Sequence, residues 1–182
     1  MPLHQIIQHN PQTKILVWKI TEPFDQLLAE VPLKEKSRVR LEGMKSELHQ
    51  RAFLSVRKLL EIAGYSDEDL HYDAFGKPYF EDGVHISISH SHEFATIILS
   101  DQNTGIDLEM QRDKITTIGY KFAESEYTFL NPKAEDYIEK LTVIWGAKEA
   151  IFKIQNEVGI SFKDHIHVAA FETGKKQTTA LL

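Results

Sequence analysis

The hydrophobic positions of this chain follow two periods, one typical of strands and one typical of helices. The segment Lys14–Ile20 (KILVWKI) is rich in β-branched and aromatic residues, which predicts a strand. Residues 21–23 (TEP) have the composition of a helix start, so we expect a short helix that stops before Pro32. The chain is therefore predicted to begin its fold with a strand followed by a helix.

A longer amphipathic helix is predicted next, ending near Gly64. Its apolar residues recur at steps of three or four: Leu41, Met44, Leu48, Ala52, Val56 and Leu59. Arg51 lies beside this apolar stripe, whereas Lys45 and Arg57 are expected to face solvent. The helix should bury one side and expose the other.

Between about residues 70 and 110 the pattern changes to short strands separated by turns. The turn signals are GKP at 76–78, EDG at 81–83 and DQNTG at 101–105. Strands are predicted at about 84–90, 94–100 and 105–110. Because the connections are so short, the strands should pair antiparallel.

A second strand–helix–strand series follows. Helical character returns at about 114–130, a long helix is predicted at about 134–154, and residues 160–171 and 177–182 have strand patterns. Two similar α+β lobes, 1–103 and 104–182, would explain this order.

Composition excludes several classes of protein. The chain has 182 residues, 42% hydrophobic and 26% charged, so it can build a core and is neither disordered nor fibrous. It has no cysteine, which excludes disulfides and thiolate metal sites. No apolar stretch approaches membrane-spanning length, and the first ten residues lack the features of a signal peptide, so we expect a cytoplasmic protein.

The net charge of −6 is unevenly distributed. Residues 32–60 carry eight Lys or Arg against three Asp or Glu, whereas residues 61–182 carry 11 against 21. A basic segment on an acidic body suits an anionic ligand, an acidic partner or nucleic acid, although it could equally be a solvated helix face. The pI of about 5.8 argues against dedicated DNA binding.

Asp107 and Glu109 are the first candidates for chemistry. At positions i and i+2 of a predicted strand, both carboxylates would leave the same face, with Cα atoms about 6.6 Å apart. Two acids without a neighbouring Cys or His favour Mg²⁺ over zinc. The alternative is an ordinary exposed strand face.

The second long helix carries an unusual set of charges. One side of it holds Trp145, Lys148, Glu149, Phe152 and Lys153, at i, i+3, i+4, i+7 and i+8. A charged trio between two aromatic residues is not a plain core stripe. The alternative is that Glu149 and Lys153 form a surface ion pair worth only about 0.3–0.5 kcal/mol.

Three further candidates are single residues. His90 ends the alternating segment HISISH, in which Ile86 and Ile88 share its face and two serines occupy the other. Lys77 lies in a turn framed by Gly and Pro, where a lysine can be aimed. For both, and for Arg51, an ordinary structural or solvated role is the alternative.

The order of the motifs makes these signals specific. GKP, ISISHS, GIDLE, FAESE and WGAKEAIFK follow one another, and the region from Arg51 to Lys153 covers more than half the chain. This series resembles the 4′-phosphopantetheinyl transferase superfamily, in its single-chain surfactin-synthetase type. Thr104 and Gly146 depart from the usual pattern but leave the charged positions intact.

The resemblance implies a fold and a reaction. The fold would be α+β, with two pseudo-twofold-related lobes, each an antiparallel sheet packed on a long helix. Because the family normally continues with further strands, we expect either a truncated sequence or a C-terminal lobe smaller than usual. The reaction would transfer the phosphopantetheine arm of coenzyme A to a serine of an apo-carrier protein and release 3′,5′-ADP. The two-lobe form is expected to work as a monomer, without nucleic acid or membrane.

The resemblance also implies residue roles. Asp107, Glu109 and Glu149 would hold Mg²⁺, and Glu126 would add an acid near the metal and the carrier serine. Glu149 would also draw the serine proton, and Lys153 would neutralise the leaving phosphate. The coenzyme A site would comprise Arg51, Lys77, Pro78, Ser89, His90, Asp107 and Lys153, with Lys34, Lys36 or Arg38 extending its basic wall.

Two other functions share parts of this pattern. Another Mg²⁺-dependent nucleotide or pyrophosphate hydrolase would share the acidic trio but would attack with water and need no protein acceptor. A non-catalytic coenzyme A-binding protein would keep the nucleotide pocket without needing the acids and Lys153.

Overall fold

A computed structural model describes residues 2–182 and divides the chain into two compact units. Unit 1 ends at Leu108, and unit 2 comprises Glu109–Leu182. The predicted boundary between two lobes, at residues 103 and 104, stays a prediction.

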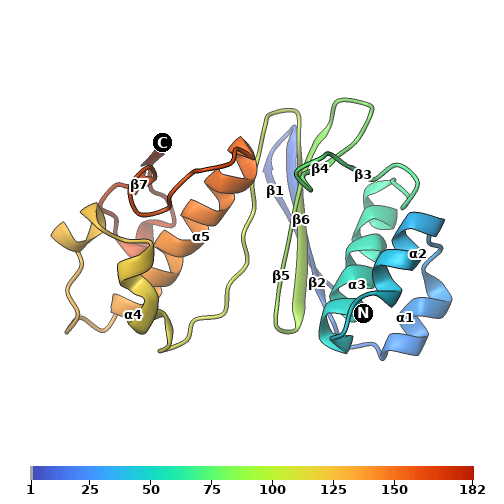
Figure 1. The fold of residues 1–182 in the computed structure, drawn as a ribbon, viewed down its shortest axis with the longest axis horizontal. Helices are drawn as coiled ribbons and strands as arrows, with labels where there is room; N and C mark the ends of the chain where they lie inside the picture. Colours follow the sequence, from blue (N-terminus) through green and yellow to red (C-terminus); the bar gives the residue numbers. More distant parts are fainter. Residues whose placement is uncertain (1) are drawn as a thin grey trace. The chain divides into compact units, whose positions relative to one another are not determined.

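The centre of unit 1 is a four-stranded antiparallel sheet in the order β1-β2-β6-β5 (Figure 1). Its strands are β1 (Leu3–Asn10), β2 (Thr13–Lys19), β5 (His85–Ser91) and β6 (Phe94–Ser100). The predicted strands at 14–20, 84–90 and 94–100 are thus confirmed within one residue at every boundary. Neither β1 nor its hairpin to β2 was predicted, because its sequence LHQIIQHN is largely polar. It is an edge strand with almost every residue exposed, so burial imposes no alternating pattern on it.

Three helices pack beside this sheet: α1 (Phe24–Glu30), α2 (Glu35–Glu42) and α3 (Glu47–Ala63). In Figure 1, α3 lies next to the sheet, and α1 and α2 lie beyond it. The predicted end of the long helix is confirmed, since Gly64 adopts a left-handed conformation with φ 91° and its N–H bonds to the last turn. Its predicted beginning is wrong, because residues 43–46 separate α2 from α3.

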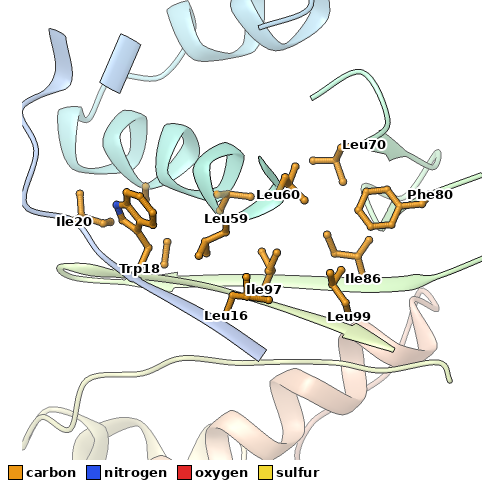
Figure 2. Close-up of a cluster of buried hydrophobic side chains, with 13 residues drawn as sticks. Leu16, Trp18, Ile20, Leu59, Leu60, Leu70, Phe80, Ile86, Ile97 and Leu99 are labelled. Atoms are coloured by element: carbon orange, nitrogen blue, oxygen red, sulfur yellow. The ribbon is translucent and has the colours of Figure 1, made fainter. Parts of the chain in front are cut away.

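The main core of unit 1 lies between α3 and one face of the sheet (Figure 2). Leu59 and Leu60 project from the helix towards Leu16, Ile97 and other strand residues. Fully burying one such side chain contributes about 1.5–3 kcal/mol. A shift of a strand by one residue would turn these side chains to the other face, so their burial stabilises the observed register.

A second cluster of unit 1 joins α1, α2 and α3 on the other side of α3, through Leu27, Leu41 and Leu54. The prediction that Arg57 faces solvent is wrong. Its side chain is buried, and its Nε donates to Asp67 Oδ1 at 2.9 Å while its guanidinium lies over the Phe53 ring. Asp67 compensates the buried charge, and no local pattern shows that partner ten residues away.

The predicted strand at 105–110 is also wrong. These residues have no partner strand; instead the backbone N–H groups of Ile106 and Leu108 donate to the hydroxyls of Ser87 and Ser89, at 3.1 Å each. Side chains alternate along β5, and Ile86 belongs to the core under α3. The segment therefore lies against the other face of β5 and is held by its serine side chains.

Unit 2 is built on the long helix α5 (Tyr137–Gln155), which confirms the helix predicted at 134–154 within three residues at its start. The predicted helical region at 114–130 consists of α4 (Ile115–Ile118) and two 3-10 turns, Gly119–Lys121 and Ser125–Thr128. The predicted final strands shrink to β7 (His167–Val168) and β8 (Ala180–Leu181), with a third 3-10 turn, Thr173–Lys175, between them. The helix packs on these elements through Phe122, Leu141, Ile144 and Val168, among others.

The fold is thus a mixed α/β fold with an antiparallel sheet packed on a long helix in unit 1. In unit 2 the described strands form a two-stranded pair beside α5. The pseudo-twofold relation between two lobes is not confirmed by these elements. No helix within residues 2–182 combines the length and the apolar character needed to cross a bilayer.

Candidate functional site

The turn that carries Lys77 in unit 1 is closed by Asp73 and lies between β3 (His71–Tyr72) and β4 (Pro78–Tyr79). The Asp73 carboxylate accepts a hydrogen bond from the backbone N–H of Lys77 at 2.9 Å. The backbone N–H of Asp73 donates to the Lys77 carbonyl at 3.0 Å. Gly76 has φ 86°, a conformation that glycine adopts without strain. The turn therefore holds the lysine backbone rigidly, as its Gly-Lys-Pro sequence predicted.

Three predicted residues of unit 1, Lys77, Ser89 and Asp107, form side-chain hydrogen bonds, and two of them bond to each other. Lys77 Nζ donates to Asn103 Oδ1 at 3.1 Å, at the start of the segment that leads to Asp107. Ser89 Oγ donates to Asp107 Oδ1, also at 3.1 Å. Because the same hydroxyl accepts the N–H of Leu108, Ser89 fixes both the backbone and the carboxylate. The motifs ISISHS and GIDLE thus meet in unit 1, and Lys77 of GKP contacts the turn that directly precedes GIDLE.

Arg51 and His90 lie elsewhere in the same unit. Arg51 is half-buried on α3, where its guanidinium donates to the carbonyls of Glu22 at 2.8 Å and Ile20 at 3.2 Å. It therefore ties α3 to the end of β2. His90 is exposed on β5, and its ring lies 5.6 Å from that of His49.

A pocket of about 330 Å³ opens beside the Lys77 turn. This volume falls within the range of small-molecule sites. Lys77 and Pro78 line it, whereas Arg51, Ser89 and His90 do not. Its other lining residues are Asp73, Tyr79, Phe80, Gly83, Val84, His85 and Ile86.

One wall of this pocket is held by Tyr65. Its ring stacks on Phe80 with centroids 4.0 Å apart, and its hydroxyl donates to Asp82 at 2.8 Å. Burial and the hydrogen bond to Asp82 raise the pKa of Tyr65 to about 12. The phenol therefore stays a neutral donor at physiological pH and keeps the turn before Gly83 in place.

In unit 2, Glu109 is paired with Trp145 of the long helix. The indole Nε1–H donates to Glu109 Oε1 at 3.0 Å. Glu109 is exposed, while Trp145 is half-buried against Phe122 and Phe162, with ring centroids 5.1 and 5.4 Å away. The contact joins the motifs GIDLE and WGAKEAIFK.

A buried ion pair joins FAESE to the same helix. Lys148 Nζ lies 2.8 Å from Glu126 Oε1, and both side chains are 0% exposed. Lys148 also donates to the carbonyls of Phe122 at 2.7 Å and Phe162 at 2.9 Å, and Glu126 accepts the backbone N–H of Val168 at 2.9 Å. These contacts tie four separate segments of unit 2 together.

The pKa of Glu126 reflects that environment. Burial alone would raise it, but the hydrogen bonds from Lys148, Val168 and the neighbouring backbone lower it below the usual glutamate value. Glu126 is therefore a carboxylate in the core. Its predicted role near a metal and a carrier serine stays a prediction.

Glu149 and Lys153 are half-buried on α5, one and two turns beyond Trp145. The predicted metal ligands fall on both sides of the division between the units, with Asp107 in unit 1 and the other two acids in unit 2. Within either unit, residues 2–182 show no group of three or more His, Asp or Glu that could hold a metal ion.

Sequence reasoning missed several of these contacts. The helical spacing places Lys148 among the charged residues of its helix and indicates no role for it, whereas its full burial makes it a core residue. Asp73, Ser87 and Asn103 were also not singled out. Two serines alternating in a buried strand were a usable signal, because buried hydroxyls need hydrogen-bond partners.

Comparisons with known proteins agree with the motif series. Residues 103–181 match the model of the 4′-phosphopantetheinyl transferase superfamily. The chain is also 28% identical over 138 residues to the "4′-phosphopantetheinyl transferase gsp" of Aneurinibacillus migulanus. That similarity covers 71% of this chain and 54% of the relative, so it spans about half the length of that curated protein. The resemblance that the motifs indicated is thereby confirmed.

Proposed function

We propose that this chain is a 4′-phosphopantetheinyl transferase that moves the phosphopantetheine arm of coenzyme A to a serine of an apo-carrier protein. The serine oxygen bonds to the phosphorus that carries pantetheine, the bond from that phosphorus to the bridging oxygen breaks, and 3′,5′-ADP leaves. The observation that carries the proposal is the set of contacts between the motifs. In unit 1 ISISHS contacts GIDLE, and in unit 2 WGAKEAIFK contacts both GIDLE and FAESE.

The nucleotide part of coenzyme A would bind to unit 1. The pocket beside Lys77 and Pro78 has the size for a base, and its Phe80 wall offers an apolar face. Lys77 would bind the 3′-phosphate, together with Arg51 and His90 and with Ser89 nearby. Lys34, Lys36 or Arg38 would extend this basic surface. The contacts of Arg51 with two backbone carbonyls give it a second, structural task.

Asp107, Glu109 and Glu149 would hold Mg²⁺. The fit rests on donor chemistry, because three carboxylates offer the oxygen ligands that hard cations prefer. The hydrogen bonds of Ser89 to Asp107 and of Trp145 to Glu109 are of the kind that orients metal ligands. When bound, Mg²⁺ would neutralise charge on the pyrophosphate.

The chain's own residues would supply the proton transfer and part of the charge. Glu149 would accept the proton of the carrier serine as it attacks. Lys153, one turn further along α5, would neutralise negative charge that develops on the leaving phosphate. Glu126 would add an acid near the metal and the carrier serine, and its ion pair with Lys148 would hold the turn of helix that carries Glu149.

The proposal includes the finer expectations of the sequence. The carrier protein would be recognised partly by basic residues, since carrier proteins are generally acidic. The two units would correspond to two pseudo-twofold-related lobes, and one chain would suffice for the chemistry in the cytoplasm, without nucleic acid or membrane.

The decisive experiment incubates the protein with coenzyme A, Mg²⁺ and a panel of apo-carrier proteins and weighs the products. A carrier should gain one phosphopantetheine on a serine, and excess EDTA should prevent it. Unchanged mass for every carrier, where a known transferase succeeds, would refute the function. Phosphate release without any carrier would identify a hydrolase, and coenzyme A binding without transfer or hydrolysis would identify a binding protein.

A further inference from the structure

We infer that Trp145 is a positioning residue for Glu109, whose carboxylate it orients towards the metal. The inference rests on the proposed function for the identity of the metal site. It goes beyond that function in assigning a task to an aromatic side chain that would otherwise be counted as part of the core of unit 2.

The donor in this contact is held rigidly. The indole of Trp145 lies edge-on to Phe122, with ring planes at 66°, and tilted against Phe162 at 46°. Rotating the indole away from Glu109 would break both ring contacts. Its N–H therefore points in a fixed direction, with Oε1 of Glu109 at 3.0 Å.

The acceptor, in contrast, would be mobile without this bond. Glu109 is exposed and follows a segment without strand pairing, so little else restricts its side-chain rotamers. Fixing a free glutamate side chain on metal binding costs conformational entropy. A carboxylate has about four lone-pair sites, so one indole hydrogen bond leaves room for a cation. The contact thus lowers the cost of binding without blocking it.

A purely structural role for Trp145 makes a different prediction. If the indole only fills space, Trp145→Phe should keep the aromatic contacts and leave metal affinity unchanged. If the N–H positions Glu109, the same substitution should lower the affinity for the metal about tenfold. Losses of this size are typical when a hydrogen bond to a metal ligand is removed. Trp145→Phe therefore distinguishes the two roles, because it removes the N–H donor and keeps an aromatic ring.

The experiment measures metal affinity directly, with Mn²⁺ as an electron paramagnetic resonance probe in the presence of coenzyme A. The variants are Trp145→Phe, Glu109→Gln and a matched control, Trp18→Phe. Trp18 also donates its indole N–H to a glutamate, Glu22 at 3.4 Å, but does so in unit 1. Mn²⁺ affinity should fall about tenfold in Trp145→Phe, at least as much in Glu109→Gln, and stay unchanged in Trp18→Phe.

A second measurement leaves Trp145 itself unchanged. The chain has two tryptophans, so Trp145 is the sole one in Trp18→Phe. Its fluorescence should change when Mn²⁺ or Mg²⁺ is added with coenzyme A, and Glu109→Gln should abolish the change. Wild-type Mn²⁺ affinity in folded Trp145→Phe, or an unchanged emission on metal addition, would overturn the inference. Metal binding with these properties but without transfer to a carrier would refute the proposed function alone.

Discussion

The buried ion pair of unit 2 gives the strongest prediction for stability. Lys148→Met removes the ammonium but keeps a long unbranched side chain of similar shape. The substitution leaves the carboxylate of Glu126 in the core without its cation. It also takes away the donor that satisfies two backbone carbonyls, those of Phe122 and Phe162.

The expected cost is large. Removing one partner of a buried ion pair typically lowers the free energy of unfolding by about 3–5 kcal/mol, because the other charge stays buried and uncompensated. Whole domains are stable by only about 5–15 kcal/mol. Lys148→Met should therefore remove a large part of the free energy of unfolding of unit 2, whereas Glu126→Gln, which keeps an oxygen for the Val168 N–H, should cost less.

A double-mutant cycle in the full chain measures this coupling. The variants are Lys148→Met, Glu126→Gln and the double substitution, all carrying Trp18→Phe so that fluorescence during urea unfolding reports on Trp145. The double variant should be more stable than the sum of the two single losses predicts, by about 1–3 kcal/mol.

A surface pair on the same helix provides the control. Lys140 lies 2.9 Å from Asp136 but is partly exposed, so Lys140→Met should cost no more than about 1 kcal/mol. The reasoning fails if Lys148→Met unfolds at nearly the urea concentration of the wild type, or costs no more than Lys140→Met.

Four further outcomes are expected. Lys77→Ala should lower kcat/KM for coenzyme A by about 10- to 150-fold, and much less for dephospho-coenzyme A; equal losses in steady-state assays would exclude a 3′-phosphate contact. In a Mg²⁺ titration, Asp107→Ala should regain activity at high Mg²⁺, whereas Glu149→Gln should keep a low kcat throughout; near-normal turnover of the latter would remove it as the base. Ser89→Ala should cost about 1–3 kcal/mol in urea unfolding, because it leaves a backbone N–H without its acceptor, and no measurable loss would contradict that role. Because the pKa of Glu126 is lowered in the folded protein, the ionised carboxylate contributes stability at pH values above the ordinary glutamate pKa. This contribution is lost as the pH falls through the lowered pKa. Acid unfolding should therefore be less steep in Glu126→Gln, and an identical pH profile would refute the assignment.

The helices and strands that bury one face could be predicted from their patterns. The spacing of apolar residues in α3 and α5 and the alternation in β5 are consequences of burial, so they are visible in the sequence. The edge strand β1 lacks this signal because both of its faces meet solvent; Ile6, for example, is 51% exposed. The segment at 105–110 has a strand-like pattern without being a strand. Its alternate backbone N–H groups bond to serine hydroxyls and not to a neighbouring strand.

The residue types available for chemistry, and the order in which the motifs follow, can be read directly from the sequence. The candidate acids, Lys77 and the long helix that carries Glu149 and Lys153 could all be found from motif order and helical spacing.

Which of these side chains are paired, and with which partners, depends on how distant segments pack together. Glu126 and Glu109 are both acids in recognisable motifs, yet one is sealed in the core on Lys148 and the other is exposed beside an indole N–H. Burial and partners depend on segments far apart in the chain, such as residues 126 and 148. A local pattern of charge therefore cannot separate a core ion pair from an exposed carboxylate.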